Sequence, residues 1–141
     1  MIKVLIVDDE KDFTELLSER LETRGFKTRI AFDGNEAISR LKEENADVVL
    51  LDVMMPGKSG VETLKEIKNS WPITEVIMLT GHGTVETAIE GMKLGAYDYL
   101  IKPTETEDLS QKITSAYQRK SDHEERIRQA EINKIIEHKG W

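Results

Sequence analysis

Short apolar runs alternate along this chain with longer stretches in which apolar residues recur every three or four positions. The clearest run, Val48–Leu51, is unbroken, which is typical of a parallel strand covered on both faces. It ends in one carboxylate, Asp52, and Pro56-Gly57 soon interrupts the chain. The same pattern predicts further strands at Lys3–Val7, Phe26–Phe32, Val76–Leu79 and Tyr97–Ile101. The Phe26–Phe32 run is more mixed, which favours a place at the edge of the sheet.

Each predicted strand is followed by a segment with helical periodicity. Capping boxes are predicted at Asp33–Glu36, Ser59–Glu62 and Thr104–Glu107. Gly25 and Gly95 are expected to end the first and fourth helices. The fourth helix is predicted from about Thr84 to Leu94. The last helix is predicted to begin at the Thr104–Glu107 box and to continue to about His138, because neither proline nor glycine occurs from Asp108 to that point.

Five strand–helix alternations with short connections predict an α/β fold, a doubly wound five-stranded parallel sheet of the flavodoxin-like order 2-1-3-4-5, followed by an extended C-terminal helix. In such a sheet the carboxyl ends of the strands lie along one edge. Chemically distinctive residues stand at or just beyond these ends: Asp8, Asp9, Asp52, Thr80 and Lys102. The predicted fold therefore brings them together.

Composition narrows the class of protein. The chain has 141 residues, a formal net charge of −7 and no cysteine. The missing cysteines exclude disulfides, thiolate metal sites and thiol chemistry, and fit a cytoplasmic protein. No apolar run approaches the ~20 residues of a membrane span, and the chain starts directly with a strand, so neither a membrane segment nor a signal peptide is expected. The acidic balance argues against direct binding of nucleic acid.

Carboxylates crowded at one sheet edge repel one another unless a cation offsets their charge. A hard divalent ion with oxygen ligands, Mg²⁺ or Mn²⁺, fits a site without sulfur or paired histidines. The backbone carbonyl of Met54 is a candidate further ligand. Lys102 adds a point charge and Thr80 a hydroxyl. This combination suits a phosphoryl group whose phosphorus is attacked by an Asp oxygen.

The motifs at these strand ends resemble those of the receiver domain of two-component response regulators, over residues 1 to about 118. The matching pieces are Val-Asp-Asp at 7–9, Leu-Asp-Val-Met-Met-Pro-Gly at 51–57 with Gly60, Leu-Thr-Gly at 79–81, and Gly-Ala-Tyr-Asp-Tyr-Leu-Ile-Lys-Pro at 95–103. The resemblance implies a phosphoacceptor that assists its own phosphorylation and dephosphorylation, and not a turnover enzyme.

The resemblance also implies a role for each residue. Asp52 would accept phosphate from a histidine of a sensor kinase or from a small phosphodonor, and Asp8 and Asp9 would hold Mg²⁺ with it. Lys102 would contact the acyl phosphate, and Thr80 would be drawn toward it.

Further positions follow from the same resemblance. Tyr99 falls at the family's aromatic switch position, where the ring turns inward as the threonine moves; a half-buried tyrosine on an edge strand is the alternative. Lys102-Pro103 matches a cis peptide of the family. Met54 and His82 occupy variable sites that flank the phosphoryl group, and neither is interpreted as a catalytic base.

Residues 80–100 further resemble receivers of bacterial enhancer-binding, nitrogen-regulation-type transcription activators, which points to regulation of transcription as the output. Thr104 departs from the common pattern, because many relatives have phenylalanine after the proline. No phosphate-binding glycine loop or helix-turn-helix pattern follows the receiver. The chain is interpreted either as a stand-alone receiver or phosphorelay carrier that acts by protein–protein contact, or as a piece of a longer protein.

The chain is expected to divide into a receiver domain, residues 1–118, and a helical C-terminal extension or linker, residues 119–141. Its charges pair at i,i+4 in Lys120–Glu124, Asp122–Arg126 and Glu124–Arg128. A solvated helix and a dimerising one both fit this pattern. Isoleucines late in the tail, at 127, 132, 135 and 136, favour a helix that packs on a second copy. A homodimer is therefore expected through the Thr84–Tyr99 face together with this C-terminal helix.

Two other classes of protein compete with this interpretation. A Mg²⁺-dependent aspartyl phosphohydrolase typically has Asp-x-Asp directly after a strand, whereas Asp52 is followed by Val53 and Met54. A flavodoxin-like cofactor binder needs a hydroxyl-rich phosphate loop after the first strand, where this chain has the acidic run 8–10.

Overall fold

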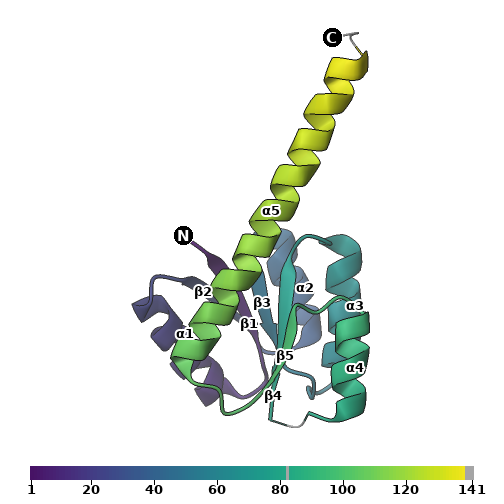
Figure 1. Ribbon diagram of the computed structural model, residues 1–141. Coiled ribbons are helices and arrows are strands. Elements are labelled where there is room, and N and C mark those ends of the chain that lie inside the picture. The colour runs from purple at the N-terminus through teal and green to yellow at the C-terminus, as the bar shows by residue number, and fades with distance from the viewer. Residues whose placement is uncertain (82, 139–141) are drawn as a thin grey trace.

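A computed structural model describes residues 1–81 and 83–138 of the chain. Five parallel strands form one sheet in the order β2-β1-β3-β4-β5, with helices on both faces (Figure 1). The predicted fold class and strand order are therefore confirmed. The strands and helices are β1 Lys3–Val7, α1 Lys11–Thr23, β2 Lys27–Ala31, α2 Gly34–Glu43, β3 Val48–Leu51, α3 Gly60–Ser70, β4 Glu75–Thr80, α4 Val85–Lys93, β5 Asp98–Ile101 and α5 Thr106–His138.

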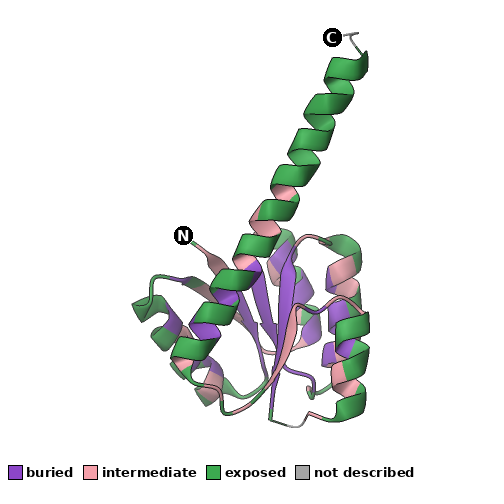
Figure 2. Cartoon of the chain, viewed as in Figure 1, coloured by how far each residue is buried: buried purple, intermediate pink, exposed green. Residues whose placement is uncertain are grey.

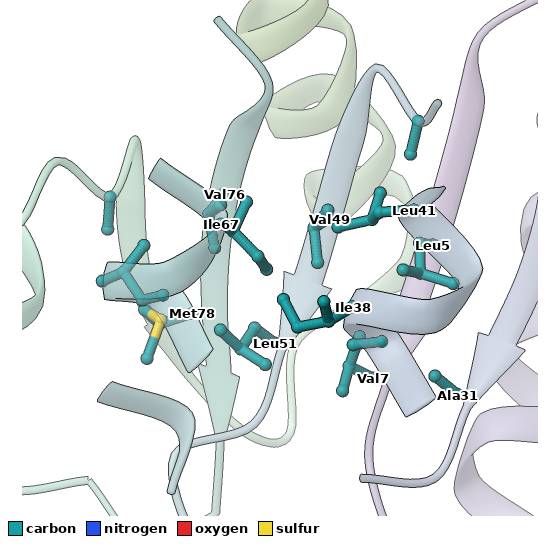
Figure 3. Packing of buried hydrophobic residues seen from close by; sticks show 14 of the residues in the cluster. Leu5, Val7, Ala31, Ile38, Leu41, Val49, Leu51, Ile67, Val76 and Met78 are labelled. Atoms are coloured by element: carbon teal, nitrogen blue, oxygen red, sulfur yellow. The ribbon is translucent and has the colours of Figure 1, made fainter. Parts of the chain in front are cut away.

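The two faces of the sheet bury separate apolar clusters, because side chains alternate along each strand. On one face α2 and α3 pack against the sheet, where Leu5, Val49 and Leu51 meet Ile38 and Leu41 (Figure 3). On the other face α1 and the first turns of α5 cover the alternate residues of the same strands. The central strands β3 and β4 are buried along their whole length (Figure 2), as the unbroken apolar run predicted for β3.

Local signals fix most helix ends. Ser59 forms the predicted capping box with Glu62, and the Asp33 side chain accepts a hydrogen bond from the Glu36 N–H at 2.8 Å. Gly25 and Gly95 follow α1 and α4 with φ of +91° and +101°, the left-handed conformation that glycine adopts most easily.

The predicted capping box at Thr104–Glu107 is wrong. The Thr104 hydroxyl donates instead to the Ile101 carbonyl at 3.0 Å, inside the turn after β5, and Glu107 pairs with Arg24 at 3.5 Å. Helix α5 therefore begins only at Thr106. Threonine hydroxyls serve turns as readily as helix caps, so the spacing alone did not distinguish the two.

Helix α5 crosses the α1 side of the sheet and continues far beyond it (Figure 1). It runs unbroken through the predicted boundary at 118/119. Of the predicted i,i+4 pairs, Lys120–Glu124 is present at 2.9 Å. Asp122 instead accepts a hydrogen bond from Gln118, and Arg128 pairs with Glu125. Among the described helices, none has an apolar stretch long enough to cross a membrane.

Candidate functional site

Asp52 lies at the carboxyl end of β3, in the middle of the sheet. Its side chain is almost fully buried at 3% exposure, and its N–H donates to the Val7 carbonyl of β1 at 3.0 Å. Helix α3 closes over the following turn at Gly60, where an added Cβ would lie 2.1 Å from the Asp52 carbonyl oxygen. The backbone that carries the Asp52 carboxylate is thus held between β1 and the start of α3.

Two more carboxylates come from the end of β1. Because Val7 pairs with Leu51 in register, the next residues on each strand, Asp8 and Asp52, are neighbours. Asp8 is buried and accepts a hydrogen bond from the Glu10 N–H at 2.9 Å, whereas Asp9 is exposed. Carboxylate oxygens of the two residues and of Asp52 lie within 4.8 Å of one another.

Lys102 reaches this acidic cluster from the end of β5. Its ammonium lies 2.6 Å from Asp8 Oδ2, 3.7 Å from Glu10 Oε2 and 4.0 Å from the centre of the Phe13 ring. Burial raises the pKa of Asp8 above its usual value, and the hydrogen bond from Lys102 only partly opposes this. The contact of Lys102 with the Phe13 ring is a cation–π interaction that sequence reasoning missed.

The negative charge of the carboxylate cluster is only partly balanced by Lys102. Oδ1 of Asp52 is buried and has no hydrogen-bond partner within the described part of the chain. Lys102 contacts Asp8 rather than this atom. Among the described residues the candidate ligands are three carboxylates, which suit a hard divalent cation such as Mg²⁺, so this donor set fits the ion that the sequence implied.

Thr80 is completely buried at the carboxyl end of β4, and its carbonyl accepts a hydrogen bond from the Lys102 N–H at 2.8 Å. The backbones that carry the hydroxyl and the ammonium are thereby joined. Tyr99, on β5, is half-buried, and its ring packs against the core. Its hydroxyl lies 2.8 Å from the Thr87 hydroxyl on α4, a contact that no sequence pattern indicated.

The remaining predicted positions lie in loops. Met54, in the loop after Asp52, has a side chain that is 58% exposed. His82 lies outside the described residues. The Lys102-Pro103 peptide is cis, as predicted. Among the predicted site residues, Asp8, Asp9 and Asp52 thus lie close together and Lys102 contacts Asp8. Thr80 is linked to Lys102 through the backbone.

Comparison with proteins of known sequence finds relatives among bacterial regulators. The transcriptional regulatory protein CpxR of Klebsiella pneumoniae is 43% identical over 119 residues, which make up 84% of this chain and 50% of that protein. CpxR of Escherichia coli strain K12 gives the same values. The chain spans about half the length of these curated relatives.

Solved structures agree with this fold. A response regulator receiver domain protein from Clostridium thermocellum has a TM-score of 0.82 and 39% identity, covering 86% of this chain and 98% of that one. NtrX from Brucella abortus, solved with ADP, has a TM-score of 0.83 and 34% identity, covering 89% of this chain and 29% of that one. The family model described as the response regulator receiver domain matches residues 4–114. The resemblance inferred from the strand-end motifs is thereby confirmed, and the chain belongs to the response regulator receiver domain family.

Proposed function

We propose that Asp52 accepts a phosphoryl group from a sensor histidine kinase or a small phosphodonor in the cytoplasm. The observation that carries this proposal is the buried Oδ1 of Asp52, which has no hydrogen-bond partner among the described residues and belongs to a cluster with Asp8 and Asp9. An Asp52 oxygen attacks phosphorus, the phosphorus–nitrogen bond of a phosphohistidine breaks, and the imidazole nitrogen takes up a proton from solvent. The product is an acyl phosphate on Asp52.

Asp8, Asp9 and Asp52, with the backbone carbonyl of Met54, would hold Mg²⁺ or, as an alternative, Mn²⁺. When bound, the ion neutralises charge on the phosphoryl oxygens. Lys102 supplies the second positive charge. Because its ammonium rests 2.6 Å from Asp8, it must exchange part of this ion pair for a phosphoryl oxygen.

Phosphorylation would act as a switch through Thr80 and Tyr99. Thr80 moves its hydroxyl toward the new acceptor oxygens, which biases an equilibrium between two existing conformations. Inward rotation of the Tyr99 ring must break its 2.8 Å contact with the Thr87 hydroxyl. The strength of that contact therefore contributes to the energy difference between the resting and active states.

The switched face would control an output, for which we propose regulation of transcription. Helix α4 and β5 expose large apolar side chains there, namely Val85, Ile89, Met92 and Ile101. This supports a homodimer through the Thr84–Tyr99 face and the C-terminal helix, with residues 1–118 as the receiver and 119–141 as its extension. A stand-alone receiver or phosphorelay carrier would use the same face for a partner protein.

Labelling with acetyl phosphate and Mg²⁺ tests the proposal. Intact-mass measurement should show one phosphoryl group per wild-type chain, and none on Asp52→Asn. Asp12→Asn, which alters an exposed carboxylate outside the cluster, should label like the wild type. An Asp52→Asn protein that takes up label at the wild-type rate refutes the proposal. Sustained turnover of an added phosphate ester favours the phosphohydrolase alternative.

A further inference from the structure

The amino end of β4, opposite the edge that carries Asp52, holds a second cluster of charges. Glu75, the first residue of the strand, is only 4% exposed. Its carboxylate pairs with the Arg119 guanidinium of α5 through both oxygens, with Nη2 2.9 Å from Oε1 and Nε in contact with Oε2. Lys68 of α3 lies 3.6 Å from the same carboxylate. A two-pronged arginine–carboxylate contact fixes direction as well as distance.

A parallel contact joins the next residue of α5 to the neighbouring strand. Asp47 immediately precedes β3, and its Oδ2 accepts a hydrogen bond from the Lys3 N–H at 2.8 Å. Its Oδ1 accepts one from the Lys120 ammonium at 3.0 Å, which also pairs with Glu124 at 2.9 Å. The Lys120 side chain is only 13% exposed. Successive residues of α5 thus bind the starts of two adjacent strands.

The environment keeps these cations charged. Hydrogen bonding to Glu75 raises the pKa of Arg119, whose guanidinium also lies 4.6 Å from the centre of the Tyr97 ring. Burial tends to lower the pKa of Lys120, but its two carboxylate partners outweigh this and raise it. The family match ends at residue 114, so both cations lie beyond the matched receiver.

Past these contacts, the described part of α5 extends into solvent. Residues 125–138 are all exposed (Figure 2). Residues 125–138 continue a helix that is already nucleated in the receiver, so the direction of this segment depends on what holds its base. Loss of Arg119 would leave the buried Glu75 carboxylate with Lys68 but without its two-pronged partner. Loss of Lys120 would leave Asp47 with the Lys3 N–H but without this cation.

We propose that the Arg119–Glu75 and Lys120–Asp47 pairs form a clasp that holds the α5 extension in one direction relative to the sheet. Residues 121–138 then move as a rigid continuation of the receiver, and any surface on them is presented at a fixed angle. The clasp requires no phosphoryl group, so this inference is independent of the proposed function. It makes residues 119 and 120 an anchored junction between receiver and extension.

Double electron–electron resonance, which measures the distance between two spin labels, tests the clasp on the full chain. Spin labels on Lys42→Cys in α2 and Glu131→Cys in the extension occupy unique sites, because the chain has no cysteine of its own. A large excess of unlabelled protein removes distances between copies. The clasp predicts a narrow distance distribution, and Arg119→Met with Lys120→Met should roughly double its width. Arg128→Met, which removes an exposed pair within the same helix, should leave it unchanged.

Graded variants keep the test valid if the double variant fails to fold. Arg119→Lys retains the charge but loses the fork, so it should broaden the distribution less than Arg119→Met. Amide exchange of residues 117–123 should rise about tenfold in Arg119→Met, while exchange in β1 stays as in the wild type. A broad wild-type distribution, or clasp variants as narrow as the wild type, would overturn the proposal.

Discussion

Replacement of Asp9 by asparagine separates two effects of the acidic cluster on stability. The carboxylates repel one another, which destabilises the fold, and by our proposal they bind Mg²⁺, which stabilises it. Asp9 is the exposed member of a group whose carboxylate oxygens lie within 4.8 Å of one another. The substitution removes one negative charge with almost no change in volume. Without added Mg²⁺ it should stabilise the protein, because Asp9 repels the carboxylates of Asp8 and Asp52. With Mg²⁺ it should lose the stabilisation that the ion confers.

The magnitude follows from the geometry. Two unit charges at this separation repel by about 1 kcal/mol at the dielectric constant of water. Because Asp9 is exposed, that value applies to each of its two neighbours, and the Lys102 ion pair with Asp8 offsets part of the total. Asp9→Asn should thus raise the free energy of unfolding in EDTA by about 1–2 kcal/mol. At a tenfold excess of Mg²⁺ over its dissociation constant, the wild type should gain about 1.4 kcal/mol.

Urea denaturation followed by circular dichroism measures both effects, in EDTA and across a Mg²⁺ titration at constant ionic strength. Asp12→Asn is the matched control, because it removes an exposed carboxylate four residues from Asp8 without touching the cluster. It should respond to Mg²⁺ like the wild type. If Asp9→Asn is less stable than the wild type in EDTA, the carboxylates do not repel one another as argued. If it gains as much stability from Mg²⁺ as the wild type, Asp9 does not help to hold the ion.

Other predictions concern single side chains. Gly60→Ala should lower the free energy of unfolding by about 2–4 kcal/mol, because its Cβ would meet the Asp52 carbonyl oxygen at 2.1 Å. Urea denaturation measures this, and an unchanged midpoint urea concentration would contradict it. The raised pKa of Lys120 means that its ion pairs contribute fully below the usual value of 10.5 and are lost as pH rises through the folded-state pKa. The difference in unfolding free energy between the wild type and Lys120→Met should therefore shrink only above pH 10.5, and a difference that shrinks between pH 7 and 9 would contradict this. Phe13→Leu should slow phosphorylation by acetyl phosphate about three- to tenfold, because Lys102 loses the ring 4.0 Å away, whereas Phe13→Tyr should keep the wild-type rate constant. Equal rate constants for all three proteins would show that the ring does not position Lys102.

Where sequence reasoning failed, the deciding interaction joined residues far apart in the chain. Glu75 lies just before the predicted strand Val76–Leu79, and no sequence pattern indicated that it is the buried first residue of β4 or that Arg119, 44 residues later, pairs with it. Lys120 was assigned to an i,i+4 pair with Glu124, which is present, but its contact with Asp47 spans 73 residues. The periodicity of apolar residues indicates which face of a helix is buried. It does not indicate which carboxylate from a distant part of the chain will pair with a given lysine.

The sequence by itself determined the strands, the helices and their order in the sheet, and it indicated which polar residues would gather at one edge. Because the strands run parallel, their carboxyl ends share one edge of the sheet, and Asp8, Asp9, Asp52 and Lys102 were therefore expected to approach one another there. Only the tertiary structure decided that Lys102 rests on Asp8 and Phe13 and that Tyr99 bonds to Thr87. These choices depend on distances of a few ångströms between side chains from different elements, which hydrophobic patterning does not encode.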